Sequence, residues 1–141
     1  MRDRRRFWVA WLQLASGAVV VFGLAMVLLP DLAARGFGAL LCSDSRRLDT
    51  FGAEARAYID LVHAVLGAVL AGWGATLLAL ARGPIARGDA NAVRIGALGV
   101  AAWFVPDTAV SLLTGFWPNA VLNAVFAAAL AIPLWALRRP G

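Results

Sequence analysis

The residues that could do chemistry in this chain are few, and the first of them is Asp107. It follows Pro106 in the stretch FVPDTAVSLL, residues 104–113, inside a run of apolar residues long enough to cross a bilayer. A carboxylate at that depth must pair with another group, take up a proton or face water, because an isolated charge is costly in lipid. Asp107 is therefore the main candidate for a functional residue.

Six further polar or aromatic residues fall on three predicted helices. Within each helix, neighbouring members of the set, Asp107 included, are three or four positions apart, the spacing that places side chains on one face. They are Asp60, His63, Trp103, Ser111, Asn119 and Asn123. We expect these residues to join Asp107 in one ligand-binding pocket, with His63 as the partner of Asp107. The alternative is that they hold the helices together, since polar side chains commonly form hydrogen bonds between membrane helices.

The same residues supply the candidates for catalysis. Asp107 would act as a general acid and the Asp60–His63 pair as a base, which would suit an isomerase or cyclase for an apolar substrate. We expect no metal and no cofactor, because the chain has a single cysteine, Cys42, and lacks an HExxH cluster, a CxxC motif and a glycine-rich phosphate loop. A haem held by two histidines would need a second copy of the chain, since His63 is the only histidine.

The composition indicates which solvent surrounds these residues. The chain has 141 residues, of which 62% are hydrophobic, whereas soluble domains are about 45–50% apolar. A soluble chain this short could not bury so much apolar surface. The lipid bilayer is therefore the expected surrounding, and the length allows a single domain over residues 1–141.

Four segments are long and apolar enough to be membrane helices. They are residues 7–29, 59–81, 95–114 and 117–137, with an outer loop at residues 30–58. We predict an all-α fold, an integral membrane four-helix bundle whose helices run antiparallel, up-down-up-down. Gly115 separates the last two spans, so these must form a tight hairpin.

The arginines predict the orientation of these spans. All thirteen basic residues are arginine, and they fall between the apolar runs rather than along one helix face, which argues against nucleic acid as a partner. With both termini cytoplasmic, nine lie inside and four outside, as the positive-inside rule requires. The inner nine are Arg2, Arg4, Arg5, Arg6, Arg82, Arg87, Arg94, Arg138 and Arg139, and the outer four are Arg35, Arg46, Arg47 and Arg56. The composition favours a bacterial inner (cytoplasmic) membrane.

This orientation brings the candidate residues to one layer of the membrane. Asp107 lies eight residues before Gly115, which is about 12 Å below the outer end of its span. Asp60 and His63 lie near the outer end of the second span, and Asn119 and Asn123 begin the fourth. In the outer loop, residues 32–41 are expected at the membrane surface, and a helix capped by Asp49 or Thr50 is expected to continue into the second span.

The number of spans, the chain length and the long first outer loop resemble those of small four-span bacterial membrane proteins such as the DoxX-like group. No diagnostic motif accompanies this resemblance, so no residue is assigned from it. For function we expect a protein that binds a small amphiphile, such as a lipid or a quinone, or that is an accessory subunit of a larger membrane complex. A proton-coupled small transporter or channel, formed as a homo-oligomer, and the isomerase or cyclase are the alternatives.

Overall fold

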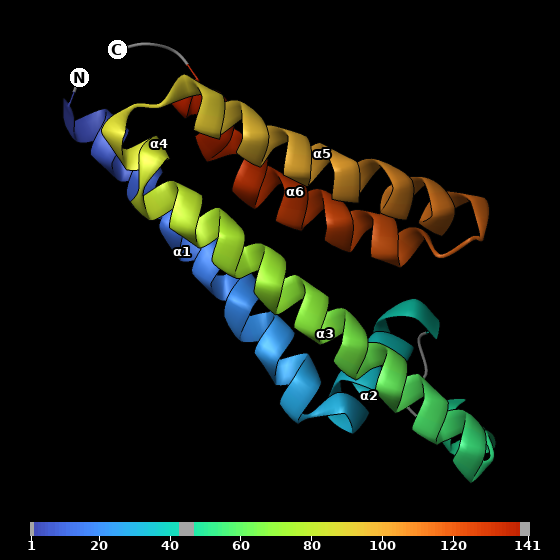
Figure 1. Cartoon of the computed structure of the whole chain (residues 1–141). Coiled ribbons are helices and arrows are strands. Elements are labelled where there is room, and N and C mark those ends of the chain that lie inside the picture. The colour runs from blue at the N-terminus through green and yellow to red at the C-terminus, as the bar shows by residue number, and fades with distance from the viewer. Residues whose placement is uncertain (1, 43–46, 139–141) are drawn as a thin grey trace. The chain divides into compact units, whose positions relative to one another are not determined.

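The computed structural model describes residues 2–42 and 47–138, and every element within these residues is a helix. In chain order they are α1 (Arg2–Leu28), α2 (Pro30–Cys42), the 3-10 helix η1 (Arg47–Thr50), α3 (Ala53–Arg82), α4 (Pro84–Arg87), α5 (Ala90–Leu113) and α6 (Trp117–Leu137) (Figure 1). The predicted all-α class with antiparallel helices is confirmed.

Four of these helices are long and apolar enough to cross a membrane, namely α1, α3, α5 and α6. The predicted spans 7–29, 59–81, 95–114 and 117–137 fall on them to within a few residues. The chain is therefore a multi-pass membrane protein. Its orientation stays a prediction, and two of the arginines on which that prediction rests, Arg46 and Arg139, lie outside the described residues.

The helices group into two compact units. The first comprises residues Met1–Ala18 and Gly74–Gly141, and the second comprises Val19–Trp73. Both α1 and α3 pass from one unit into the other. The first unit holds most of the buried apolar side chains, among them Leu12, Leu77, Ile85, Leu130 and Leu134.

The α5–α6 hairpin of the first unit turns through a glycine. Gly115 has φ = 82°, a left-handed conformation that favours glycine. Its N–H donates to the Leu112 carbonyl (3.2 Å), and the Phe116 N–H donates to the Ser111 carbonyl (2.8 Å). These two bonds form a Schellman motif, which satisfies carbonyls at the end of α5. The predicted tight hairpin is confirmed.

Within the first unit, three side chains of α1 donate hydrogen bonds to backbone carbonyls of other segments. Arg5 Nη2 donates to the Ile85 carbonyl (2.8 Å), and Gln13 Nε2 donates to the Ala81 carbonyl (3.4 Å) at the end of α3. Trp11 Nε1 donates to the Ala129 carbonyl of α6 (3.0 Å). That carbonyl lacks its usual helical donor, because the residue four positions later is Pro133, which has no N–H.

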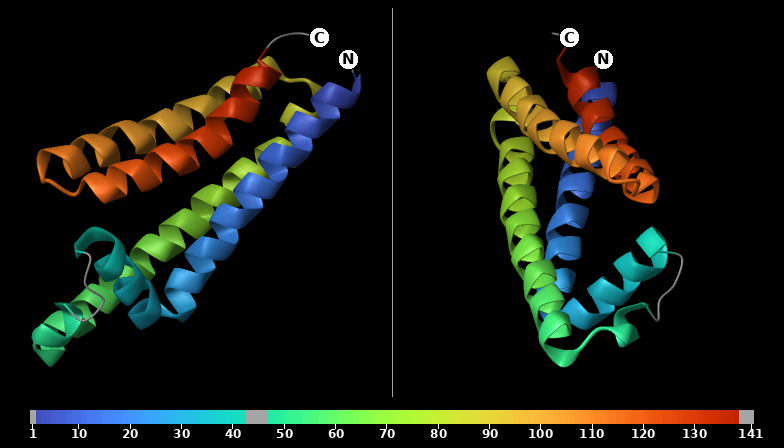
Figure 2. Two further views of the ribbon diagram at one scale, coloured as in Figure 1. Left: turned by 180° about the vertical axis from the view of Figure 1, so that it is seen from behind. Right: turned by 90° about the vertical axis from the view of Figure 1, so that its right-hand side faces the viewer.

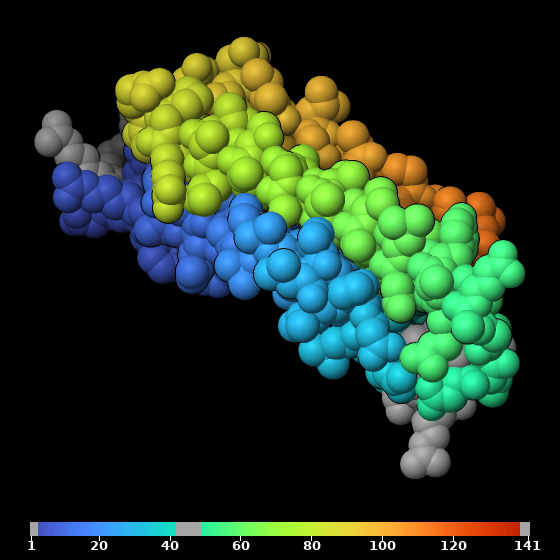
Figure 3. All heavy atoms as spheres, turned by 60° about the horizontal axis from the view of Figure 1, so that its bottom comes forward, coloured from blue at the N-terminus to red at the C-terminus, as the bar shows by residue number. Residues whose placement is uncertain are grey.

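In the second unit, α1 and α3 approach each other through two glycines. A Cβ atom added to Gly23 would lie 2.5 Å from the Gly67 carbonyl oxygen, and one added to Gly67 would lie 2.5 Å from the Gly23 carbonyl oxygen. Only glycine, which has no side chain, allows the backbones of α1 and α3 to lie this close together. Figure 3 shows the atoms of this part of α1 and α3 lying against each other.

The outer loop is more regular than predicted. After α1 ends at Leu28, the chain turns away from the axis of α1 and forms α2 over Pro30–Cys42 (Figure 2). The prediction that Asp49 or Thr50 caps the helix of the second span is wrong. Both residues lie in η1, and α3 begins at Ala53. Phe51 and Gly52 separate the two elements, and glycine favours such an interruption.

Candidate functional site

Asp107 lies at the centre of a polar cluster on α5. The side chains of Trp103 and Ser111, one helical turn before and after it, face the same side. Trp103 Nε1 donates to Asp107 Oδ2 at 3.2 Å. Ser111 Oγ lies 2.7 Å from the Asp107 carbonyl oxygen, to which its hydroxyl donates, and 3.3 Å from Asp107 Oδ1. Ser111 is buried, whereas Asp107 and Trp103 are half-buried.

Asn119 completes this cluster from the first turn of α6. Its Nδ2 donates to Asp107 Oδ1 at 3.0 Å and to Ser111 Oγ at 2.8 Å. The Schellman turn at Gly115 is short enough to bring the start of α6 back to this level of α5. We call Trp103, Asp107, Ser111 and Asn119 the Asp107 cluster. It links the two helices of the hairpin through side chains alone.

Asn123 lies one turn further along α6 and makes a separate contact. Its side chain is buried, and its Nδ2 lies 3.5 Å from Thr108 Oγ1, a distance at which a hydrogen bond is weak. Thr108 was not predicted as a site residue, because its spacing does not match the face that carries Asp107. The proximity of α5 and α6 at this height is what brings it to Asn123.

The Asp107 carboxylate receives hydrogen bonds from neutral groups only. The Trp103 indole and the Asn119 amide donate to it, and the Ser111 hydroxyl lies 3.3 Å from it. No cationic side chain contacts it among residues 2–42 and 47–138. Hydrogen bonds to a carboxylate stabilise its charged form, but they leave the net charge in place. Each carboxylate oxygen can also accept more than one bond. The cluster is thus a fixed acceptor site within an apolar span.

Pro106 precedes this acid without interrupting the helix. α5 runs from Ala90 to Leu113 with Pro106 inside it, although proline withholds the N–H that would bond to the Ala102 carbonyl. Membrane helices tolerate such a position where other groups satisfy the backbone.

Asp60 and His63 belong to the second unit, where they have other neighbours. His63 Nδ1 lies 2.8 Å from the Ile59 carbonyl oxygen, so this nitrogen carries the proton that is donated. The imidazole ring also contacts Phe37 of α2, with a centroid distance of 5.5 Å. The structure therefore brings Asn119 to Asp107 as predicted, whereas the pairing of His63 with Asp107 stays a prediction.

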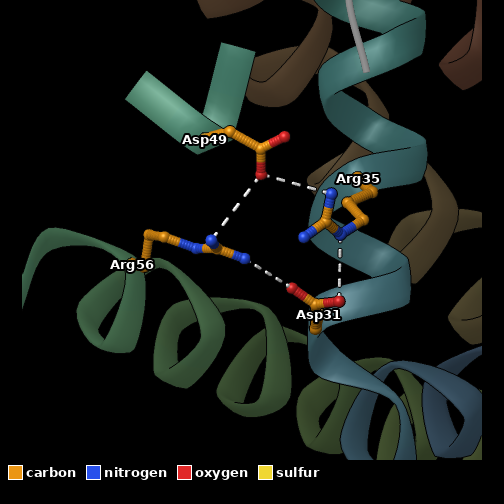
Figure 4. A network of polar contacts seen from close by, with 4 residues as sticks. All are labelled: Asp31, Arg35, Asp49 and Arg56. Atoms are coloured by element: carbon orange, nitrogen blue, oxygen red, sulfur yellow. Dashed lines mark hydrogen bonds and ion pairs between the residues drawn. The ribbon is translucent and has the colours of Figure 1, made fainter. Parts of the chain in front are cut away.

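A second polar group, not predicted from the sequence, lies in the outer loop (Figure 4). Asp31 and Asp49 each contact both Arg35 and Arg56, so the four side chains form a closed ring, which we call the arginine–aspartate ring. Asp31 lies 3.0 Å from Arg35 and 3.1 Å from Arg56, and Asp49 lies 3.3 Å and 3.6 Å from them. The ring ties α2, η1 and the start of α3 together.

Part of this ring was visible in the sequence. Asp31 and Arg35 are four positions apart, a spacing that places opposite charges side by side on a helix. Nothing in the spacing indicates Asp49 or Arg56, because both reach the pair only through the fold of the loop.

The ring shifts the pKa values of Asp31 and Arg35. The hydrogen bond from Arg35 is the main cause that lowers the pKa of Asp31 below its usual value. Burial opposes this shift, and the charge of Arg35 and the hydrogen bond and charge of Arg56 add to it. The pKa of Arg35 is raised in return. A lowered folded-state pKa means that Asp31 adds stability above its unfolded pKa, and this stability is lost as the pH falls through the folded value. The ring is therefore intact at neutral pH and weakens only in strong acid.

Comparison with known proteins identifies no family. No protein-family model, no curated protein and no solved structure matches the chain. The resemblance to DoxX-like proteins therefore rests only on size, span number and the long first outer loop. Among the residues that the structure describes, no three His, Cys, Asp or Glu side chains form a group that could hold a metal ion. The chain is a small membrane protein with four candidate spans. Within the part of the chain that the structure describes, the Asp107 cluster joins α5 to α6.

Proposed function

We propose that the chain is a non-enzymatic protein of the bacterial inner membrane that binds a small amphiphile, and that the Asp107 cluster receives the polar head of this ligand. The observation that carries this proposal is a carboxylate in an apolar span whose contacts, among the residues that the structure describes, are all with neutral side chains. An acid kept in lipid without a cation is costly. A ligand that donates hydrogen bonds, or that carries a positive charge, would offset this cost.

The acceptor character of the cluster limits the chemistry of the ligand. Asp107 offers carboxylate lone pairs beyond those already occupied, and the amide oxygen of Asn119 accepts no hydrogen bond from the described residues. We therefore expect a hydroxyl or amine head, such as that of a long-chain alcohol, a quinol or an amine. An anionic head would be repelled by the carboxylate. The apolar surfaces of the spans would hold the hydrocarbon part.

The depth of the cluster supports a ligand that enters from one leaflet. Asp107 is about two helical turns from Gly115, or about 12 Å along the helix axis. With both termini in the cytoplasm, as the arginines predict, the cluster lies in the outer half of the bilayer. In this position it is open to a lipid or quinone-like molecule that diffuses within the membrane.

Binding of three amphiphiles with the same chain and different heads tests this proposal. Dodecylamine, dodecanol and dodecanoate would be titrated into the full chain in nanodiscs, with the fluorescence of Trp103 taken as the difference between wild type and Trp103→Phe. Trp103 is a suitable reporter because it donates to Asp107. We expect a saturable signal with the amine and the alcohol and none with dodecanoate.

The matched variants are Asp107→Asn and Val105→Ala. Asp107→Asn keeps the shape but removes the charge, and we expect it to weaken amine binding about tenfold, because hydrogen bonds to charged groups are stronger than neutral ones by about 1–1.5 kcal/mol. Val105 is exposed on the same helix, so Val105→Ala should bind like wild type. An equal response to dodecanoate, or unchanged amine binding by Asp107→Asn, would reject the proposal.

A proton-coupled small transporter or channel is the second candidate, and the same carboxylate favours it. An acid without a cationic partner in a span can change its protonation as a substrate binds and leaves. Liposomes that contain the chain would then show a flux that depends on pH and that Asp107→Asn abolishes. The isomerase or cyclase, which would need Asp60 and His63 beside Asp107, is the third candidate.

A further inference from the structure

The helix α2 presents three different faces, and one of them carries exposed leucine side chains. Its polar face carries Asp31 and Arg35, which belong to the arginine–aspartate ring. Its second face is turned inward, since Ala34 is 2% exposed and Phe37 contacts the ring of His63. Its third face carries Leu32 and Leu40, which are 64% and 40% exposed.

We propose that this third face is embedded in the bilayer interface, so that α2 lies along the membrane surface as an in-plane helix. Leu32, Gly36 and Leu40 are four positions apart and therefore line one side of the helix. About 100° separates Asp31 from Leu32 around the helix axis, so the charged ring lies beside the leucine face and not within it. A helix with this arrangement lies with its apolar side about 5–10 Å into the boundary between headgroups and acyl chains.

The connection to α1 supports lipid as the occupant of this face. Leu29 is the only residue between α1 and α2, and it bonds in both directions, to the Ala25 carbonyl (2.8 Å) and from the Ala33 N–H (3.0 Å). This short, hydrogen-bonded connection therefore keeps the start of α2 at the membrane depth at which α1 ends. Leu28 and Leu29, at that end, are 74% and 53% exposed. The exposed leucines of α2 continue this lipid-facing surface.

The arginine–aspartate ring indicates which force holds α2 to the membrane. The ring contains two acids and two arginines, so its net charge is zero, and Arg35 is engaged by Asp31 and Asp49. This arginine does not offer a free charge to anionic headgroups. We infer that burial of the leucine face holds α2 at the interface and that the attachment does not depend on lipid charge.

Spin-label depth measurements on the full chain test this inference. In a Cys42→Ser background, a nitroxide would be attached at Leu32→Cys or Leu40→Cys, with Glu54→Cys as the aqueous reference and Val65→Cys as the reference within a span. Glu54 and Val65 are both exposed. Collision with oxygen and with a water-soluble nickel chelate would be compared in vesicles of phosphatidylcholine, with and without phosphatidylglycerol.

We expect labels at Leu32 and Leu40 to show depths between the two references, and the same depths in both vesicles. Nickel accessibility equal to that at Glu54 would overturn the inference, since the face would then lie in water. Labels that are immobile and shielded from both reagents would also overturn it, because a protein surface would then cover the leucines. A depth that appears only with phosphatidylglycerol would refute attachment through the apolar face.

Discussion

Asn119 is the residue through which the two helices of the C-terminal hairpin share one polar network. Its amide donates to both Asp107 and Ser111, so a single side chain of α6 satisfies two acceptors of α5. Inside an apolar span, water does not replace a hydrogen-bond donor that the carboxylate loses. The hairpin therefore depends on this amide more than on an ordinary contact.

We expect Asn119→Leu to destabilise the protein by about 1 kcal/mol, the usual size of a hydrogen bond between membrane helices. The change would be measured as a lower midpoint of unfolding in a titration with sodium dodecyl sulfate. Val121→Ala is the matched control, because Val121 is exposed two positions away on the same helix. Equal midpoints for the two variants would mean that the cluster adds no stability, and a ligand role would then be its main function.

At the scale of the elements, α1 and α3 cross in close backbone contact at Gly23 and Gly67. The backbones are near enough that a methyl group on either residue meets the other helix at 2.5 Å. Real side chains do not tolerate such distances, so the helices would have to separate. The crossing thus sets the distance between the two spans.

Gly23→Ala is therefore expected to destabilise the protein by about 1–3 kcal/mol, the usual cost of overpacking. The control lies on the same helix, since a Cβ at Gly17 has nothing within 4 Å. Gly17→Ala should be neutral or stabilising, because alanine is a better helix former than glycine. Thermal unfolding in detergent would compare them, and a loss of stability in both variants would show that helix packing is not the cause.

The sequence was sufficient for the elements but not for all of their partners. Apolar length and the break at Gly115 predicted the four spans and the hairpin, because a bilayer imposes a minimum length on any helix that crosses it. Helical spacing also predicted that Trp103 and Ser111 would share a face with Asp107, and the depth of Asn119 in the fourth span predicted that it would lie at the same level. The ring of Asp31, Arg35, Asp49 and Arg56 escaped prediction, since three elements meet there and spacing is informative only within one helix.

At the scale of the whole molecule, the number of spans determines where the termini lie. Four crossings would place both ends on the same side, and the arginine distribution predicts that this side is the cytoplasm. In the first unit, the start of α1 and the end of α6 lie at the same end (Figures 1 and 2). The contact of Trp11 with the Ala129 carbonyl joins these two terminal helices.

A reporter at the C terminus tests this orientation. A fused green fluorescent protein should fluoresce in bacterial cells, whereas a fused alkaline phosphatase should be inactive, because the former folds in the cytoplasm and the latter requires export. The same two reporters inserted after Gly52, in the exposed segment between η1 and α3, should give the opposite result. Phosphatase activity at the C terminus would reverse the orientation and would place the Asp107 cluster in the inner leaflet.

The division into two units has a consequence for how the chain is made. Residues 19–73 form one unit without interruption, so that unit is complete as soon as the ribosome has passed Trp73. The other unit combines residues 1–18 with residues 74–141, and bonds such as that from Trp11 to Ala129 must wait for α6 to enter the membrane. During this interval the N-terminal turns of α1 lack their final neighbours, and the insertion machinery or a chaperone of the membrane would have to shield them.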